Sequence, residues 1–148
     1  MLTGINVYFN DVLIPVKNLK VYSQLYPTAG TPNLLYINKK NTQIVVTPSL
    51  SAQFQDISFV NGVYTRLGGT HVDAWIKACF QPIVKKLSKK GAKFSLTDVK
   101  RFFRIFVSVQ TANPEFDSQS KHKLESAFKA RVETKETNKL LKLSLIHI

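Results

Sequence analysis

The strongest chemical signal in the sequence is a concentration of positive charge. The segment Lys77–Arg104 contains nine lysine or arginine residues and a single acidic residue, Asp98. It therefore supplies two thirds of the chain's net charge of +12. Clustered lysines attract phosphate groups and are a typical footprint of polyanion binding. We predict a local polyanion contact in this segment, centred on the basic stretch Leu87–Phe94; a helix end that is merely solvated is the alternative.

No residue pattern for catalysis or for metal binding accompanies this charge. The three histidines share no metal-ligand spacing with the single cysteine, Cys79, or with paired carboxylates. The sequence has no glycine-rich phosphate loop, and its aspartates do not cluster as a magnesium-dependent cleavage centre requires. We therefore expect no catalytic residue and no metal ligand. Cys79 falls on an apolar helical stripe, which predicts a buried thiol.

Hydrophobic periodicity predicts the elements that position these residues. Val72–Leu87 carries an apolar stripe at three- and four-residue steps, which indicates a helix packed on a sheet. Pro82 should kink this helix, and Gly91 should end it. The other expected elements are a hairpin at Val7–Ile14, a helix in Asn18–Tyr26, strands at Leu34–Ile37, Gln43–Thr47 and Phe54 or Gln55 to Val63, a short helix at Thr97–Arg101, a strand at Phe103–Val109 with one face inward, and a helix at His122–Ala130.

Two further stretches resemble a known family. Ser58–Asp73 reads Ser-Phe-Val-Asn-Gly-Val-Tyr-Thr-Arg-Leu-Gly-Gly-Thr-His-Val-Asp, and Asn113–Lys121 reads Asn-Pro-Glu-Phe-Asp-Ser-Gln-Ser-Lys. The paired glycines permit a turn with positive φ before a helix, and Thr70 can cap that helix. Together the stretches resemble the transducer domain of type IIA DNA topoisomerases of the eukaryotic and large-DNA-virus kind. The resemblance runs from about Tyr8 to about Ala127.

The resemblance implies a fold and a function. The fold would be α+β, a four-stranded, largely antiparallel sheet with helices on one face and a left-handed crossover, as in transducers of GHKL-type ATPases and a small-subunit ribosomal protein. Residues 1–142 would be a transducer fragment of an ATP-dependent DNA topoisomerase, an isomerase that passes one duplex through another. ATP and Mg²⁺ would serve the whole enzyme, a homodimer that acts on double-stranded DNA. The ATPase domain would lie upstream and the TOPRIM and cleavage domains downstream, so the fragment alone should be inactive.

The resemblance also assigns site residues. From the sequence alone, Lys121 is an ordinary solvated loop residue. In the family, however, a Gln-Thr-Lys loop reaches into the ATPase domain, where its Gln and Lys touch the γ-phosphate. Gln119 and Lys121 match this pattern, while Ser120 replaces the threonine. Family members also carry a lysine triplet that faces the captured duplex, and its positions here are Ser88, Lys89 and Lys90, so one lysine is missing. Nearby lysines that can compensate are Lys85, Lys86 and Lys93.

Two other readings stay open at this point: a stand-alone basic nucleic-acid-binding module of the same fold, and a mismatch-repair-type GHKL transducer. The Asp-Ser-Gln-Ser-Lys loop argues against the first, and the combination of Gly-Gly-Thr-His with Phe-Asp-Ser-Gln argues against the second. The last six residues, 143–148, match the translation of a sequencing adaptor, so we expect a non-native tail there and a longer natural chain at both ends. With no signal peptide or apolar span, the expected location is intracellular: the nucleus, or the host cytoplasm or viral factory if the protein is viral.

Overall fold

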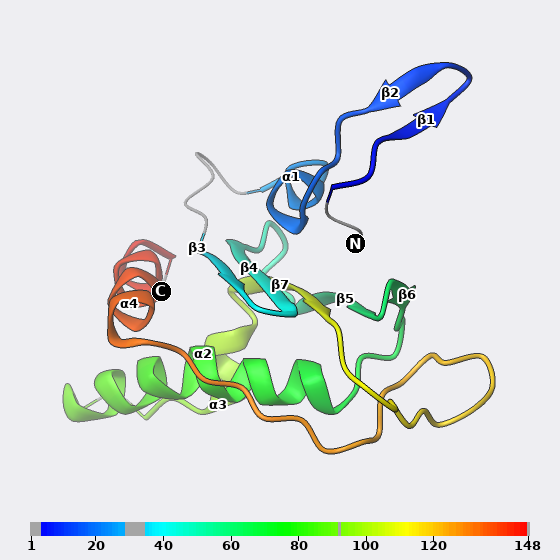
Figure 1. The fold of residues 1–148 in the computed structure, drawn as a ribbon. Helices are drawn as coiled ribbons and strands as arrows, with labels where there is room; N and C mark the ends of the chain where they lie inside the picture. Colours follow the sequence, from blue (N-terminus) through cyan, green and yellow to red (C-terminus); the bar gives the residue numbers. More distant parts are fainter. Residues whose placement is uncertain (1–3, 29–34, 92, 148) are drawn as a thin grey trace.

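The computed structural model describes residues 4–28, 35–91 and 93–147. Its centre is a five-stranded sheet with the strand order β3-β4-β7-β5-β6, and a two-stranded hairpin, β1-β2, projects away from it (Figure 1). The strands are β1 (Val7–Phe9), β2 (Val12–Ile14), β3 (Leu35–Lys39), β4 (Thr42–Pro48), β5 (Gln55–Val60), β6 (Val63–Tyr64) and β7 (Phe103–Val109). The helices are α1 (Leu19–Ser23), α2 (Thr70–Lys89), α3 (Leu96–Lys100) and α4 (Thr134–His147).

The sheet is mixed, and this corrects the predicted four-stranded, largely antiparallel one. The central strand β7 pairs antiparallel with β4 and parallel with β5, with Ile57 opposite Phe106. A parallel pair needs a long crossover, which α2 and α3 provide. The fifth strand arises because Asn61 and Gly62 both adopt positive φ, so the chain reverses and Val63 starts β6 instead of prolonging β5. The left hand of the crossover remains a prediction.

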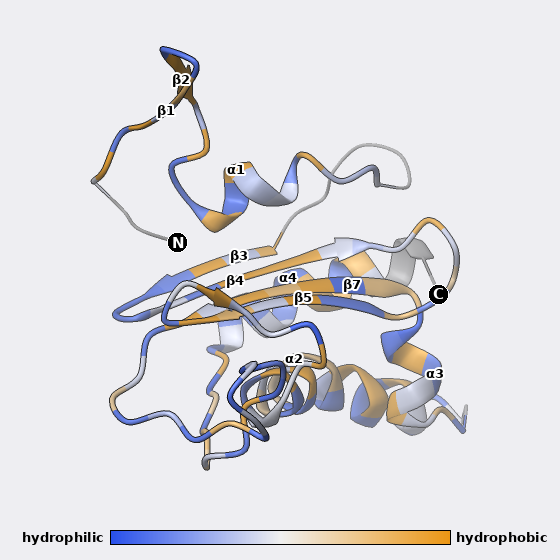
Figure 2. Ribbon diagram, turned by 90° about the vertical axis from the view of Figure 1, so that its right-hand side faces the viewer, coloured by the Kyte–Doolittle hydropathy of each residue, from blue (hydrophilic) through white to orange (hydrophobic). Residues whose placement is uncertain are grey.

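Helices cover both faces of the sheet, where the prediction placed them on one. Figure 2 shows α2 and α3 on one side of the sheet and α1 on the other. On the α1 side, Tyr22 and Tyr26 pack against Phe106 of β7, with the Tyr26 and Phe106 ring centroids 5.2 Å apart. All seven residues of β7 are therefore buried, and the predicted single inward face is wrong for this strand. Tyr22 of α1 and Tyr26, which follows that helix, are the physical reason for the difference.

Helix α2 confirms the clearest sequence prediction. Its apolar stripe is buried against the sheet, and Phe80 stacks on Phe103 of β7 with ring centroids 5.2 Å apart. The helix continues through Pro82 as one element and ends at Lys89. Gly91 follows with φ of +85°, and its N–H donates to the carbonyl of Ser88, as expected for a glycine that ends a helix.

The predicted helix at His122–Ala130 is wrong. This segment is irregular, and Leu124 forms single bridges with Gly69 and with Phe116. Its backbone groups bond to the start of α2 and to the Glu115 region, so they are not available for helical bonds. The helix in this part of the chain is α4, which the sequence analysis did not predict. It includes residues expected to be foreign, and Leu143 is buried beside Leu140 in the core.

The remaining elements follow the predictions closely. The Val7–Ile14 hairpin is present and turns at Asn10 and Asp11, which both have positive φ. Helices α1 and α3 lie inside or next to their expected ranges. The two expected strands are β3 and β4, which pair antiparallel, and Leu34 lies outside the described residues. None of the helices in the described part of the chain combines the length and apolarity needed to cross a membrane.

Candidate functional site

The residues predicted to contact ATP lie in a long connection between β7 and α4. We call Glu115–Ser126 the Gln-Ser-Lys loop. Its two sides are joined near the base by the Glu125 N–H, which donates to the carbonyl of Glu115 at 2.8 Å. Closer to the tip, the Asp117 N–H donates to the carbonyl of Lys123 at 3.1 Å. These bonds give a hairpin-like loop with residues 118–122 at its tip.

The three predicted contact residues are exposed at this tip. Lys121 adopts a φ of +55°, and its Nζ lies over the ring of Phe116, 5.9 Å from the centroid. The hydroxyl of Ser120 is 2.8 Å from that of Ser118. Among the described residues, the ion pairs involve Lys39 and Lys135, so no carboxylate neutralises Lys121. The loop therefore presents an uncompensated ammonium group and the amide of Gln119 to solvent.

The returning side of the loop is bonded to the residues that lead into α2 and to the first residue of that helix. The Leu67 N–H donates to the carbonyl of His122 at 2.9 Å, and the Leu124 N–H donates to the carbonyl of Gly68 at 3.2 Å. The Thr70 N–H in turn donates to the carbonyl of Leu124 at 3.0 Å. The two sequence motifs thus meet in space. Sequence reasoning missed Leu124, although the paired glycines signalled a close approach of another backbone.

Thr70 does not act as the expected helix cap. The N-cap is Gly69, which has no side chain to offer, and Thr70 is the first helical residue. The Thr70 hydroxyl instead donates to the carbonyl of Ser126 at 2.5 Å. Its role is to join α2 to the loop.

Three buried polar side chains lie beneath this contact. Ser58 Oγ is 2.6 Å from Thr65 Oγ1, which is 3.3 Å from His71 Nε2. All three residues are fully buried. Burial lowers the pKa of His71 to about 4, so the imidazole is neutral at physiological pH. His71 also packs against the ring of Phe128.

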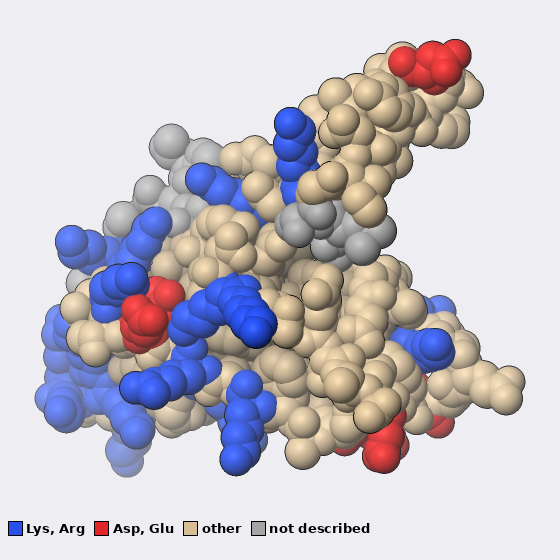
Figure 3. Space-filling model, viewed as in Figure 1, with Lys and Arg blue, Asp and Glu red and all other residues tan. Residues whose placement is uncertain are grey.

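The residues predicted to contact DNA lie at the other end of α2. We call Lys85–Lys93 the basic tip. Its five lysines are exposed, and none takes part in an ion pair within the described part of the chain. The Ser88 hydroxyl donates to the carbonyl of Val84 at 2.9 Å, so its proton is already used inside the helix. Figure 3 shows lysine and arginine side chains gathered on the side of the molecule where α2 ends.

Helix α2 separates the two candidate sites. It has 20 residues, which corresponds to about 30 Å at a rise of 1.5 Å per residue. Figure 1 shows the Gln-Ser-Lys loop at the end where α2 begins and the basic tip at the opposite end.

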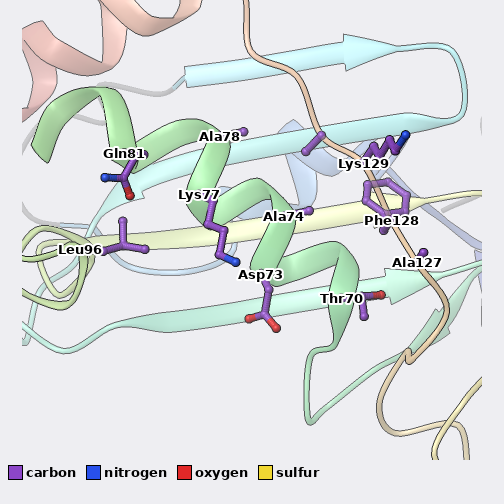
Figure 4. Close-up of a pocket in the computed structure, with 11 residues that line it drawn as sticks. Thr70, Asp73, Ala74, Lys77, Ala78, Gln81, Leu96, Ala127, Phe128 and Lys129 are labelled. Carbon is purple, nitrogen blue, oxygen red and sulfur yellow. The ribbon is translucent and has the colours of Figure 1, made fainter. Parts of the chain in front are cut away.

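A groove of about 880 Å³ runs along the outer face of α2. Figure 4 shows Asp73, Lys77 and Gln81 following one another along the helix, with Phe128 from the segment after the loop on the other side. The segment that follows the Gln-Ser-Lys loop, residues 127–130, therefore runs along α2. Among the described residues, no three His, Cys, Asp or Glu side chains come together as a metal site.

The chain is similar to known proteins over most of its length. The sequence profile of the family described as DNA gyrase B matches residues 7–147. DNA topoisomerase 2 of Invertebrate iridescent virus 6 is 34% identical over 129 residues, which are 83% of this chain and 11% of that protein. DNA topoisomerase 2 of Arabidopsis thaliana is 36% identical over 145 residues, 90% of this chain and 10% of that protein. The chain thus spans about a tenth of the length of these relatives.

Solved structures agree with this result. The ATPase region of Saccharomyces cerevisiae topoisomerase II matches with a TM-score of 0.77 and 30% identity, over 97% of this chain and 39% of that one. The ATPase and transducer domains of DNA topoisomerase II from Balamuthia mandrillaris match with a TM-score of 0.81 and 26% identity, over 98% of this chain and 41% of that one. The chain therefore belongs to the type IIA DNA topoisomerases, and it corresponds to part of their ATPase region.

Proposed function

We propose that this chain is the transducer segment of an ATP-dependent DNA topoisomerase, in which it couples contact with the γ-phosphate of ATP to gate closure and duplex passage. The observation that carries the proposal is the position of α2. Its first turn is hydrogen-bonded to the Gln-Ser-Lys loop, and its last turn bears the basic tip. A change in the loop that follows nucleotide state can therefore reach the DNA-facing end through one helix.

The nucleotide contact is assigned to Gln119, Ser120 and Lys121. An ammonium group is a compact charge with three donors, which suits a terminal phosphate. Lys121 is exposed and unneutralised, so it loses little by pairing with an anion. The contact exists with ATP and disappears when the γ-phosphate leaves. A ligand shifts a conformational equilibrium only by its differential affinity for the two states, and this contact supplies such a difference.

The DNA contact is assigned to the basic tip: Lys85, Lys86, Ser88, Lys89, Lys90 and Lys93. The five exposed lysines can pair with phosphates without breaking an ion pair of the described chain. The Ser88 hydroxyl can accept a bond but its proton is engaged, so the lysines carry the interaction. Contacts of this kind are independent of sequence, as the transport of any duplex requires.

The upstream partner is the ATPase domain of the same chain. The hairpin β1-β2 exposes apolar side chains on both faces, with Phe9 70% and Val12 67% exposed. An exposed apolar patch of this kind marks a contact surface. The matched solved chains extend well beyond the 39–41% that this chain covers, and they comprise an ATPase region. We assign the hairpin to packing against that domain.

The whole enzyme would be a homodimer that uses ATP and Mg²⁺, with TOPRIM and cleavage domains further along the chain. The described residues bring no metal-ligand cluster together, so we assign the Mg²⁺ ligands to the ATPase domain and derive no step from this chain through the ion. The enzyme would act in the nucleus, or in the host cytoplasm or viral factory if it is viral.

The test is photolabelling of the longer chain that includes the ATPase domain. An ATP analogue with a photoreactive group on the γ-phosphate should label residues within 118–122, as mapped by mass spectrometry. An analogue with the same group on the β-phosphate of ADP should label this loop much less. Labelling confined to the ATPase domain with both analogues would remove the nucleotide role from the loop.

A further inference from the structure

We propose that Gly69 and Thr70 are positioning residues for Lys121. They fix the Gln-Ser-Lys loop against the first turn of α2 and so hold its tip in the orientation that meets the terminal phosphate of a nucleotide. The inference rests on the proposed function, because it assumes that Lys121 contacts that phosphate. Neither Gly69 nor Thr70 is among the residues assigned above to the nucleotide or to DNA.

Gly69 is the residue that allows the loop to approach. Its φ of +137° lies in a region that residues with a side chain rarely adopt. A Cβ at this position would lie 2.5 Å from the backbone nitrogen of Leu124 and 2.9 Å from its Cα. Backbone atoms cannot rotate away as a side chain can. Leu124 is itself buried, so it cannot move outward without leaving the core.

Thr70 fixes the position of the loop against α2 through two hydrogen bonds. The first N–H groups of a helix lack partners inside the helix, and an N-cap side chain usually supplies one. Here Gly69 supplies none, and the carbonyl of Leu124 accepts from the Thr70 N–H at 3.0 Å. The Thr70 hydroxyl adds a second bond, to the carbonyl of Ser126 at 2.5 Å. The loop thus satisfies one of the N–H groups at the start of α2 that have no partner inside the helix.

The junction is close enough to Lys121 to set its orientation. Leu124 follows Lys121 by three residues. Between them, Lys123 is bonded twice to Asp117, through its carbonyl at 3.1 Å and through its N–H to the carboxylate at 3.2 Å. These bonds leave little freedom between the junction and the tip. A shift of Leu124 away from α2 therefore turns Lys121 away from its present direction.

The experiment uses the longer chain that carries the ATPase domain and measures the dissociation constants of ADP and of the β,γ-imido analogue of ATP. Lys121→Ala should lower the preference for the ATP analogue by about 10- to 100-fold, the loss of one charge-assisted contact. Gly69→Ala should lower it by a similar factor. Thr70→Val should lower it by about 2- to 10-fold, the loss of one neutral hydrogen bond. If Gly69 acts through Lys121, the double variant Gly69→Ala/Lys121→Ala should be no worse than Lys121→Ala.

Gly62→Ala is the matched control. Gly62 also has a positive φ, +81°, but a Cβ there would meet no atom within 4 Å. Gly62→Ala also puts a side chain on a residue with positive φ, but without a clash, so its nucleotide preference should stay at the wild-type value. Hydrogen exchange on the 148-residue chain adds a direct readout of the junction. The amides of Leu67, Thr70 and Leu124 should exchange faster in Thr70→Val while those of β4 and β7 stay protected.

Two results would separate the inference from the function on which it rests. If Lys121→Ala lowers the preference but Gly69→Ala and Thr70→Val leave it unchanged, or add to it independently, the positioning role is overturned and the nucleotide role stands. If Lys121→Ala has no effect, the nucleotide role fails and the positioning role fails with it. Should Gly69→Ala not fold, Thr70→Val decides by the same criteria.

Discussion

The basic tip makes a quantitative prediction about DNA binding. Replacing Lys86, Lys89 and Lys90 with alanine removes three of five exposed lysines that have no ion-pair partner in the described chain. Each phosphate neutralised contributes about −0.9 to the slope of log K against log salt for duplex DNA. If most of the five lysines engage, the wild-type slope should be about −3 to −4. The triple variant should therefore have a slope that is flatter by about 2 to 3 units.

The assay is fluorescence anisotropy with duplexes of unrelated sequence over a series of salt concentrations. The matched control replaces Lys17, Lys20 and Lys40, which are also exposed but lie near α1 and in the β3-β4 turn. This control removes the same charge, so it separates the effect of the basic tip from that of the net charge. Equal slopes for the triple variant and the wild type, or equal losses in both variants, would refute a specific DNA contact at the basic tip.

Three further predictions concern the folded chain. The pKa of His71 in the folded chain is about 4, below the ordinary value of 6.5, so the unfolded state binds the proton more tightly. The contribution of the neutral His71 to the free energy of unfolding is therefore complete above about pH 6.5 and declines as the pH falls toward 4. Urea unfolding should show that the wild type loses about 2 to 3 kcal/mol more than His71→Gln between pH 7 and pH 4.5, and equal losses would contradict this. Burial raises the pKa of the Cys79 thiol to about 12, so a thiol reagent should label Cys79 slowly in the native chain and rapidly in guanidinium. Rapid labelling of the native chain would show that the thiol lies at the surface. The double substitution Phe9→Ser and Val12→Ser should change the unfolding free energy of this chain by less than about 0.5 kcal/mol, because both side chains are exposed, and a large loss would show that the hairpin packs within the chain.

Local sequence patterns predicted those elements whose packing depends on residues that are neighbours in the sequence. The stripe of α2 repeats at helical steps and is buried against one sheet, so periodicity found it. The turn at Asn10 and Asp11 was predictable because these residue types tolerate positive φ. The burial of both faces of β7 was not, because it depends on Tyr22 and Tyr26, which are far away in sequence.

The segment His122–Ala130 shows how a local pattern can mislead. Leu124 and Phe128 are four residues apart, as on a helix face, and both pack against the core. Their backbone follows a different course because Leu124 bonds to Gly68 and Thr70. Sequence reasoning had identified the glycines and the Gln-Ser-Lys motif separately. Their meeting is a tertiary contact across more than fifty residues, which no local signal contains.

The proposed contact between Lys121 and the γ-phosphate is tested by Lys121→Ala in the longer enzyme, measured as ATP-driven relaxation of supercoiled plasmid beside ADP affinity. A charge-assisted contact contributes about 1.5 to 3 kcal/mol, so relaxation and ATP turnover should fall together by about 10- to 100-fold. ADP affinity should stay near the wild-type value, Lys121→Arg should rescue in part, and Gln119→Ala should be milder. Relaxation at the wild-type rate by Lys121→Ala would show that Lys121 is an ordinary surface lysine and that the coupling does not pass through this loop.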